Sequence, residues 1–419
     1  MNIQKITLPL LLLVLLLSSA CKTTKLLSDQ SISIEAIKKD VYFLADDKLE
    51  GREIGTNGEL IAAEYIVKRF KEIGVAPVGT DGSYYQSFTG KAEVDPHGNK
   101  VDSENKPPRG INVIGFLDNS APTTIIIGAH YDHLGYGKFG SLHAGEPEIH
   151  NGADDNASGV SAMLQLAEHL KNRYTANNYL LIAFSGEEKG LWGSNYFSKN
   201  PTIEKSTMNY MINLDMVGRL KPEKTIAING VGTSPSWVPV IDKLKVNGLK
   251  PVTTESGIGP SDHTSFYLID VPAIAFFTGQ HADYHKPTDD ADKVNYPGIQ
   301  SVVQYVDALI GKLNGRGKLT FTKTKDDSMG GDTPRFTVTL GVMPDYLFGD
   351  KGMRIDGVRE GRPASNAKML AGDIVIQMGE HKVDDMNGYM DALSKFKKGD
   401  TTVVKFKRGE ELMETTVNF

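Results

Sequence analysis

Four apolar runs, each followed by a polar segment, constrain the fold of this chain most. The runs are TTIIIGA before His130, YLLIAFSG before Glu187, YMINL before Asp215 and PAIAFF before His285. Continuous apolar runs are typical of parallel strands that helices cover on both faces. Polar residues beyond the carboxyl ends of such strands meet at one edge of the sheet. The sequence therefore predicts an α/β fold with a mixed, mainly parallel sheet flanked by helices, and a site at that edge.

The length of the chain indicates more than one domain, and its charge argues against nucleic-acid binding. A chain of 419 residues with 40% hydrophobic content is long enough for two or three domains, each with its own core. The net charge is -6, and the lysines and arginines are spread along the sequence. Nucleic-acid binding needs a clustered basic surface, so we expect no nucleic-acid partner.

Residues 1–20 have the features of an export signal. Lys5 precedes an apolar stretch over residues 8–17, which is too short to cross a bilayer comfortably, and SSA precedes Cys21, the single cysteine. This arrangement resembles a bacterial lipoprotein. The resemblance implies a lipidated Cys21 and a membrane anchor facing the periplasm, with the outer membrane favoured over the inner. Residues 21–33, which are polar with Lys, Thr and Ser, are expected to be a tether. The alternative is a secreted protein that is cut nearby and carries an incidental cysteine.

Residues 34–314 are predicted to form the first domain. Apolar residues at three- and four-residue spacing predict helices over 34–46 and 57–73, with Gly74 as a stop. A polar loop is expected over 79–109. A last helix is expected in IQSVVQYVDALIGKL, which NGRGK ends. Residues 315–334 are expected to be a linker.

The polar segments contain the residue types that zinc prefers. They are GAHYDHLG, NGADDNASG, FSGEEKG, INLDMVGR and DYHKPTDD. A catalytic zinc pair is bound by His, Asp and Glu, with one carboxylate that bridges the ions. His130 ends a strand, and Asp132 can orient its ring. The adjacent carboxylates of Glu187 and Glu188 are costly to bury without a cation, so one can bind metal while the other acts as a base.

Each segment also has a structural interpretation. Asp154 lies just before the amphipathic helix SGVSAMLQLAEHL and can cap it. His285 lies in a loop rich in proline and aspartate, where it can be a surface histidine. His133 and the other remaining histidines are expected to be structural or exposed. Five such segments in this order, four of them after an apolar run, favour the metal site.

Together these motifs resemble the di-zinc aminopeptidases of the secreted bacterial leucyl type, whose relatives include glutamate carboxypeptidases and glutaminyl cyclases. The resemblance covers about residues 35–314. It implies that Asp154 bridges two Zn²⁺ ions and that a cis peptide joins Asp154 to Asp155. The remaining roles it implies are Glu188 and His285 for one ion, His130 and Asp215 for the other, Asp132 as the residue that orients His130, and Glu187 as the general base.

The segment SDHTSF, residues 261–266, extends the same resemblance. It implies contact with the transition state or with the substrate. The structural alternative is a turn that Ser and Asp side chains stabilise.

Residues 335–419 are predicted to form a second, small β-rich domain. EGRPASNAKMLAGDIVIQMGE resembles a PDZ domain, and LGV at 340–342 falls where its carboxylate-binding loop is expected. Such a domain adds an extended peptide to its sheet edge. The alternative is a domain that packs on the catalytic unit and binds no peptide.

The leading hypothesis is a metal-dependent aminopeptidase that removes single residues from the N-termini of peptide substrates. A glutaminyl cyclase on the same scaffold is the main alternative. A dipeptidase or carboxypeptidase also stays open, because ligand residues do not encode which terminus is bound. A peptide-binding lipoprotein with an inactive catalytic unit is disfavoured, since every expected ligand position and Glu187 are filled.

Overall fold

The computed structural model describes residues 32–90, 107–143, 145–324, 338–345, 348, 350–358 and 361–419. The predicted signal peptide, Cys21 and most of the tether lie outside these residues. Ile32, at the end of the predicted tether, is buried in the core of the first domain. None of the described helices combines the length and apolarity that a membrane crossing needs.

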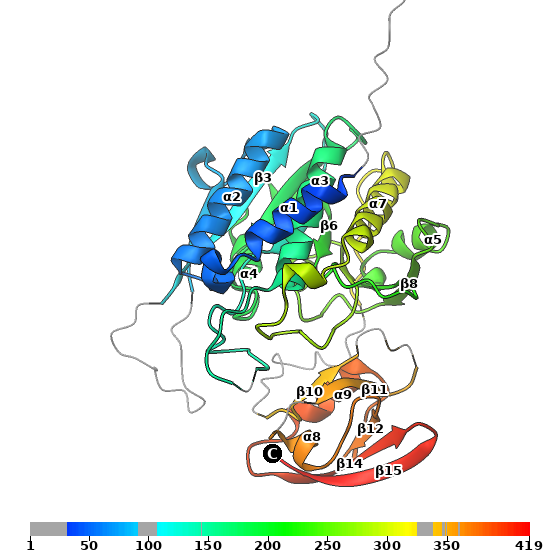
Figure 1. Cartoon of the computed structure of the whole chain (residues 1–419). Helices are drawn as coiled ribbons and strands as arrows, with labels where there is room; N and C mark the ends of the chain where they lie inside the picture. Colours follow the sequence, from blue (N-terminus) through cyan, green and yellow to red (C-terminus); the bar gives the residue numbers. More distant parts are fainter. Residues whose placement is uncertain are drawn as a thin grey trace, which may run out of the picture. The chain divides into compact units, whose positions relative to one another are not determined.

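The first domain is built on a mixed sheet that has nine strands in the described part of the chain (Figure 1). The strands are β1 (Ala76–Pro77), β2 (Tyr85–Thr89), β3 (Arg109–Leu117), β4 (Thr124–His130), β5 (Asn178–Phe184), β6 (Met208–Leu214), β7 (Thr225–Asn229), β8 (Lys250–Thr254) and β9 (Ala273–Phe277). Their order is β1-β3-β5-β4-β6-β9-β7-β8, with β2 paired to β3.

The four central strands β5, β4, β6 and β9 run parallel. Every residue of β4, β5 and β6 is buried, as their continuous apolar runs predict. These four strands are the ones that precede the polar segments, so their carboxyl ends lie along one edge of the sheet. The predicted fold class is confirmed.

Helices cover both faces of this sheet. They are α1 (Ile34–Leu44), α2 (Asn57–Ile73), α3 (Gly159–Leu170), α4 (Trp192–Lys199), α5 (Trp237–Ile241), α6 (His263–Tyr267) and α7 (Tyr296–Leu313), with short turns η1 (Asp47–Arg52), η2 (Thr80–Gly82), η3 (Ala153–Ser158), η4 (Lys205–Thr207), η5 (Val231–Thr233) and η6 (Ala291–Lys293). Figure 1 shows α1, α2, α3 and α7 over the same face.

The alternation of side chains along β4 shows the two layers directly. Ile125 and Ile127 pack into the core under α1, α2, α3 and α7. Ile126, between them, packs on the other face with Phe197 of α4 and Phe266 of α6. Successive strand side chains point to opposite faces, so a run of isoleucines fills both cores.

The helix ends follow the sequence signals. Thr56 caps α2 by accepting the backbone N–H of Glu59, and Gly74 ends it in the left-handed conformation. The side chain of Asn295 caps α7.

The polar loop expected over residues 79–109 is corrected in part, because β2 lies within it and pairs with β3. The pattern of β2 is weak because two of its five residues are only half-buried and one is exposed.

The first domain continues beyond the helix α7. Leu319 is buried in its core, and its backbone N–H donates to the side chain of Asn209 at 2.8 Å. The backbone N–H and hydroxyl of Thr324 lie 3.1 and 3.0 Å from the Tyr267 hydroxyl. The first part of the expected linker therefore packs on the sheet domain, and its remainder lies outside the described residues.

The second domain has an antiparallel sheet of six strands in the residues described, with the order β10-β11-β12-β14-β15 and β13 paired to β12. Its elements are β10 (Val342–Pro344), β11 (Met353–Val358), α8 (Pro363–Asn366), β12 (Ile374–Met378), β13 (His381–Lys382), α9 (Met386–Ser394), β14 (Thr401–Arg408) and β15 (Glu411–Asn418). A separate apolar core, which includes Leu340 and Val404, fills it. The small β-rich domain is thus confirmed.

Candidate metal centre

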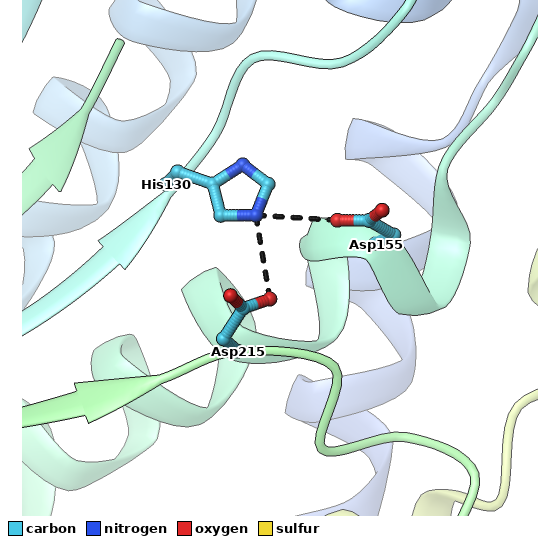
Figure 2. Close-up of side chains that lie close together, drawn as sticks. All are labelled: His130, Asp155 and Asp215. Carbon is cyan, nitrogen blue, oxygen red and sulfur yellow. Dashed lines mark ion pairs between the residues drawn. The ribbon is translucent and has the colours of Figure 1, made fainter. Parts of the chain in front are cut away.

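Three of the polar side chains meet beyond the carboxyl ends of β4 and β6. His130 is the last residue of β4, Asp215 directly follows β6, and Asp155 lies in the turn η3 (Figure 2). The His130 Nε2 atom lies 3.2 Å from Asp155 Oδ1 and 3.4 Å from Asp215 Oδ1. Atoms this close, all capable of binding a metal, form one group that can hold an ion.

A second group shares Asp155 with the first. The His285 Nε2 atom lies 3.2 Å from Asp155 Oδ2 and 3.2 Å from Glu188 Oε2. His133, Asp155 and Glu188 also lie close enough to hold an ion. Because the two oxygens of Asp155 face different groups, this carboxylate has the position of a bridge between two ions.

The resemblance implies Asp154 as the bridging residue, but the structure does not bring it into either group. Its carboxylate accepts the backbone N–H of Gly218 at 2.6 Å and the hydroxyl of Ser158 at 3.0 Å. Its other oxygen lies 3.2 Å from His281 Nε2. Asp155, and not its neighbour Asp154, is therefore the carboxylate that faces both groups. The cis peptide also lies one residue later than expected, between Asp155 and Asn156.

Asp132 connects two of the strand ends. Its carboxylate accepts the backbone N–H of Glu187 at 3.1 Å and that of Glu188 at 3.4 Å. It also lies 3.7 Å from His130 Nδ1, while the backbone carbonyl of Asp132 lies 3.2 Å from the same nitrogen. Both groups of Asp132 can therefore fix the His130 ring, and its carboxylate sets the path of the chain through Glu187 and Glu188.

The SDH segment lies beside this cluster. The Ser261 hydroxyl donates to Asp215 Oδ2 at 2.6 Å and orients that carboxylate. Asp262 is buried, and burial together with Asp215 and Asp132 raises its pKa to about 7. The segment thus belongs to the candidate centre and is not a distant surface turn.

Comparison with known proteins finds two families, one after the other along the chain. The family model of peptidase family M28 matches residues 112–310, and the model of the PDZ domain matches residues 321–419. The chain contains an M28 peptidase domain followed by a PDZ domain.

Curated relatives match this chain over part of their length. The alkaline phosphatase isozyme conversion protein of Escherichia coli (strain K12) is 32% identical over 172 residues, which are 39% of this chain and 46% of that protein. Aminopeptidase YwaD of Bacillus subtilis (strain 168) is 26% identical over 201 residues, 45% of this chain and 41% of that protein. The chain therefore spans less than half the length of either relative.

Solved structures share the fold of the M28 domain. A leucine aminopeptidase precursor from Bacteroides thetaiotaomicron superposes with a TM-score of 0.53 at 18% identity, over 68% of this chain and 98% of that chain. A glutaminyl cyclase from Porphyromonas gingivalis gives 0.52 at 18% identity, over 67% of this chain and 98% of that chain. At such low identity these structures show a common fold alone.

The charge balance of the M28 domain fits two divalent ions. Six carboxylates lie in or beside the cluster, and the buried Arg52 contributes a positive charge to it. Three of them are buried and three are half-buried, and so many carboxylates close together are costly unless protons or cations neutralise them. Carboxylate oxygens and imidazole nitrogens are the donors that zinc uses in catalytic sites. The six carboxylates are those of Asp132, Asp155, Glu187, Glu188, Asp215 and Asp262.

The pKa shifts separate two kinds of carboxyl group in the M28 domain. Burial raises the pKa of Glu187 well above its usual range, and the neighbouring carboxylates of Asp215 and Asp262 add to this shift. Burial also acts to raise the pKa of Glu188, but the imidazoles of His285 and His133 outweigh it and lower that pKa to about 2. Glu188 is therefore ionised, as a ligand must be, while Glu187 is suited to exchange a proton.

Sequence reasoning misses one residue of the cluster entirely. His133 is expected to be structural or exposed, yet its Nδ1 atom lies 2.7 Å from Glu188 Oε1. The available signal is its place three residues after His130 in HYDHLG. Two residues three apart on an extended segment do not have to face the same side. The spacing alone therefore does not predict that His133 lies in the same cluster as His130.

A buried carboxyl group behind the centre gives the M28 domain a testable pH dependence. Glu59 accepts the Gly55 N–H at 2.6 Å and the Ser185 hydroxyl, and burial raises its pKa to about 7. Because the folded state holds this proton more tightly than the unfolded state, Glu59 makes the free energy of unfolding fall as pH rises from about 4.5 to about 7. Since a tenfold change in proton affinity corresponds to about 1.4 kcal/mol, the loss is up to about 3 kcal/mol.

Glu59→Gln should remove this dependence, because the amide resembles the protonated acid. Denaturant unfolding at pH 5 and pH 8, in the presence of a chelator, measures it. The exposed Glu64 on the same helix gives the matched control, and Glu64→Gln should follow the wild type. An equal free-energy difference between Glu59→Gln and wild type at both pH values would refute the assignment.

Proposed function

We propose that the M28 domain is a two-zinc aminopeptidase that removes the N-terminal residue from peptides. The observation that carries the proposal is the position of Asp155, whose two oxygens face two separate groups of potential ligands. His130 and Asp215 would hold one ion with Asp155, and Glu188 and His285 the other. The aminopeptidase named among the relatives supports the reaction class.

Two zinc ions, when bound, supply an activated water molecule and polarise the scissile carbonyl. The residues of the chain handle the proton. Glu187 follows β5 next to the ligand Glu188, and its raised pKa suits a group that accepts a proton from water and then donates it to the leaving amine. Ser261 holds the carboxylate of Asp215 in place, and Asp132 holds the backbone of Glu187.

The product masses of a mixed peptide set test the proposal. The purified chain with zinc should shorten peptides by one residue from a free N-terminus, and a chelator should stop the reaction. N-acetylated versions of the same peptides are the control and should stay intact. Loss of ammonia from Gln peptides without shortening would identify a glutaminyl cyclase instead. Cleavage of acetylated peptides from the other end would identify a carboxypeptidase, and cleavage of dipeptides alone a dipeptidase.

The PDZ domain is proposed to bind an extended peptide along β10. Within the described residues, β10 is an edge strand that pairs only with β11, so its outer edge can accept another strand. Gly341, in the left-handed conformation, turns the chain just before β10, where LGV is expected to form the carboxylate-binding loop. A free C-terminal carboxylate should then matter, and equal binding of C-terminally amidated peptides would contradict this.

We also propose that lipidated Cys21 anchors the protein to a membrane, on the resemblance of residues 1–21 to a lipoprotein signal. The mature N-terminus of protein isolated from membranes tests it by mass spectrometry. An unmodified cysteine there would contradict the proposal.

A further inference from the structure

His133 lies inside the candidate metal centre but has no role in the two-ion arrangement proposed above. It is 1% exposed. Its Nδ1 atom lies 2.7 Å from Glu188 Oε1 and 3.9 Å from Asp155 Oδ2. Its ring meets the ring of His285 edge-on, with centroids 5.8 Å apart and planes at 71°. A histidine in this position can either bind an ion directly or donate a hydrogen bond to Glu188.

The distances distinguish these roles. Two atoms bound to one tetrahedral zinc at about 2.0–2.1 Å lie roughly 3.3 Å apart. His285 Nε2 is 3.2 Å from both Asp155 Oδ2 and Glu188 Oε2, which matches two ligands of one ion. The 2.7 Å between His133 and Glu188 is shorter and matches a hydrogen bond to a charged carboxylate. The His133 Nδ1–H group therefore donates to Glu188 Oε1.

The backbone around His133 holds its ring in this position. Gly152 has φ 56°, and a Cβ atom built there would lie 2.5 Å from His133 Cδ2. A side chain at residue 152 would thus displace the ring. The backbone N–H of His133 donates to the carbonyl of Arg52 at 3.2 Å. The ring is fixed between Gly152, which precedes the turn of Asp155, and the carboxylate of Glu188.

We propose that His133 is a positioning residue for Glu188. Its hydrogen bond occupies Oε1 and turns Oε2 toward His285, so that Glu188 offers one oxygen to the ion. The inference rests on the proposed two-zinc function, and it concerns one of the two sites only. Loss of a hydrogen-bond partner of a metal ligand typically weakens metal binding about 10–100-fold. The group of His130, Asp155 and Asp215 does not include His133, so that site should keep its affinity.

Zinc titration of the full chain by calorimetry, after removal of bound metal, tests the proposal. His133→Leu removes the donor, whereas His133→Asn has a similar shape and places an amide N–H near the position of Nδ1. We expect Leu to weaken one of the two sites about 10–100-fold and Asn to restore most of that loss. His169→Asn is the matched control, since His169 lies near a carboxylate, 3.6 Å from Asp307, at the other end of α3. It should bind zinc as the wild type does.

Two results would overturn the proposal. If Asn and Leu weaken the site equally, His133 binds the ion directly; if neither changes the affinity, His133 only fills space. Wild-type protein that binds no zinc would instead refute the proposed function itself, so the two failures are distinguishable. Thermal unfolding with chelator checks that each variant folds. If Leu does not fold, His133→Gln replaces it, because its amide extends toward the position of Nε2, and equal affinities for Asn and Gln then contradict the proposal.

Discussion

Glu187→Gln is expected to lower kcat by about 10²–10⁴-fold, the range typical of a lost general acid–base group. Glutamine has nearly the same shape but can neither accept the proton from water nor deliver it to the leaving amine. Because Glu188, not Glu187, faces His285, the variant should still bind two zinc ions. Peptide cleavage rates and zinc content measured on the same preparation test both statements.

Glu53→Gln provides the control for this experiment. Glu53 is a partly exposed carboxylate whose Oε1 atom lies 3.0 Å from Lys189 Nζ, two residues from Glu187 in sequence. The substitution removes a negative charge near Glu187 but leaves Glu187, the group proposed to exchange the proton, unchanged. The variant should therefore keep nearly full activity. A Glu187→Gln enzyme with more than about a tenth of the wild-type kcat would contradict the role assigned to Glu187.

Asp155→Asn should remove zinc binding at both sites, whereas Asp154→Asn should leave it largely intact. An amide in place of the Asp155 carboxylate has one good donor atom and no charge, so it cannot serve two ions. We expect the zinc affinity to fall by more than about 100-fold, which exceeds the typical loss when a hydrogen-bond partner of a metal ligand is removed. Asp154 faces Gly218, Ser158 and His281 instead.

The paired variants share one chemical change on adjacent residues, so each controls for the other. Zinc stoichiometry after dialysis against a weak chelator, together with activity, gives the readout. Loss of zinc in Asp154→Asn with retention in Asp155→Asn would reverse the assignment and restore the prediction made from the sequence.

Much of the fold was predictable because the central strands are buried on both faces. The isoleucines of β4 serve two cores at once, so their run is continuous and distinct from a helix or a surface strand. The carboxyl ends of β4, β5 and β6 then locate His130, Glu187, Glu188 and Asp215 without further information. β2 was not predicted because it is short and partly exposed, so its sequence has no clear apolar pattern. Its place in the sheet comes from its pairing with β3.

The details of the centre depend on local geometry that no sequence pattern contains. Asp154 and Asp155 are chemically identical neighbours, and only the path of the turn η3 decides which carboxylate faces His130. His133 likewise depends on the missing side chain of Gly152, which lets its ring approach the backbone. The apolar runs predict which strand ends lie together, and the local backbone conformation decides which side-chain atoms meet there.

Anomalous diffraction at the zinc edge, from crystals grown with zinc, tests the central claim most directly. We expect two peaks, one on either side of the Asp155 carboxylate, the first beside His130 and Asp215 and the second beside Glu188 and His285. A single peak, or a peak beside Asp154 and His281 with none at Asp155, would contradict the two-zinc centre.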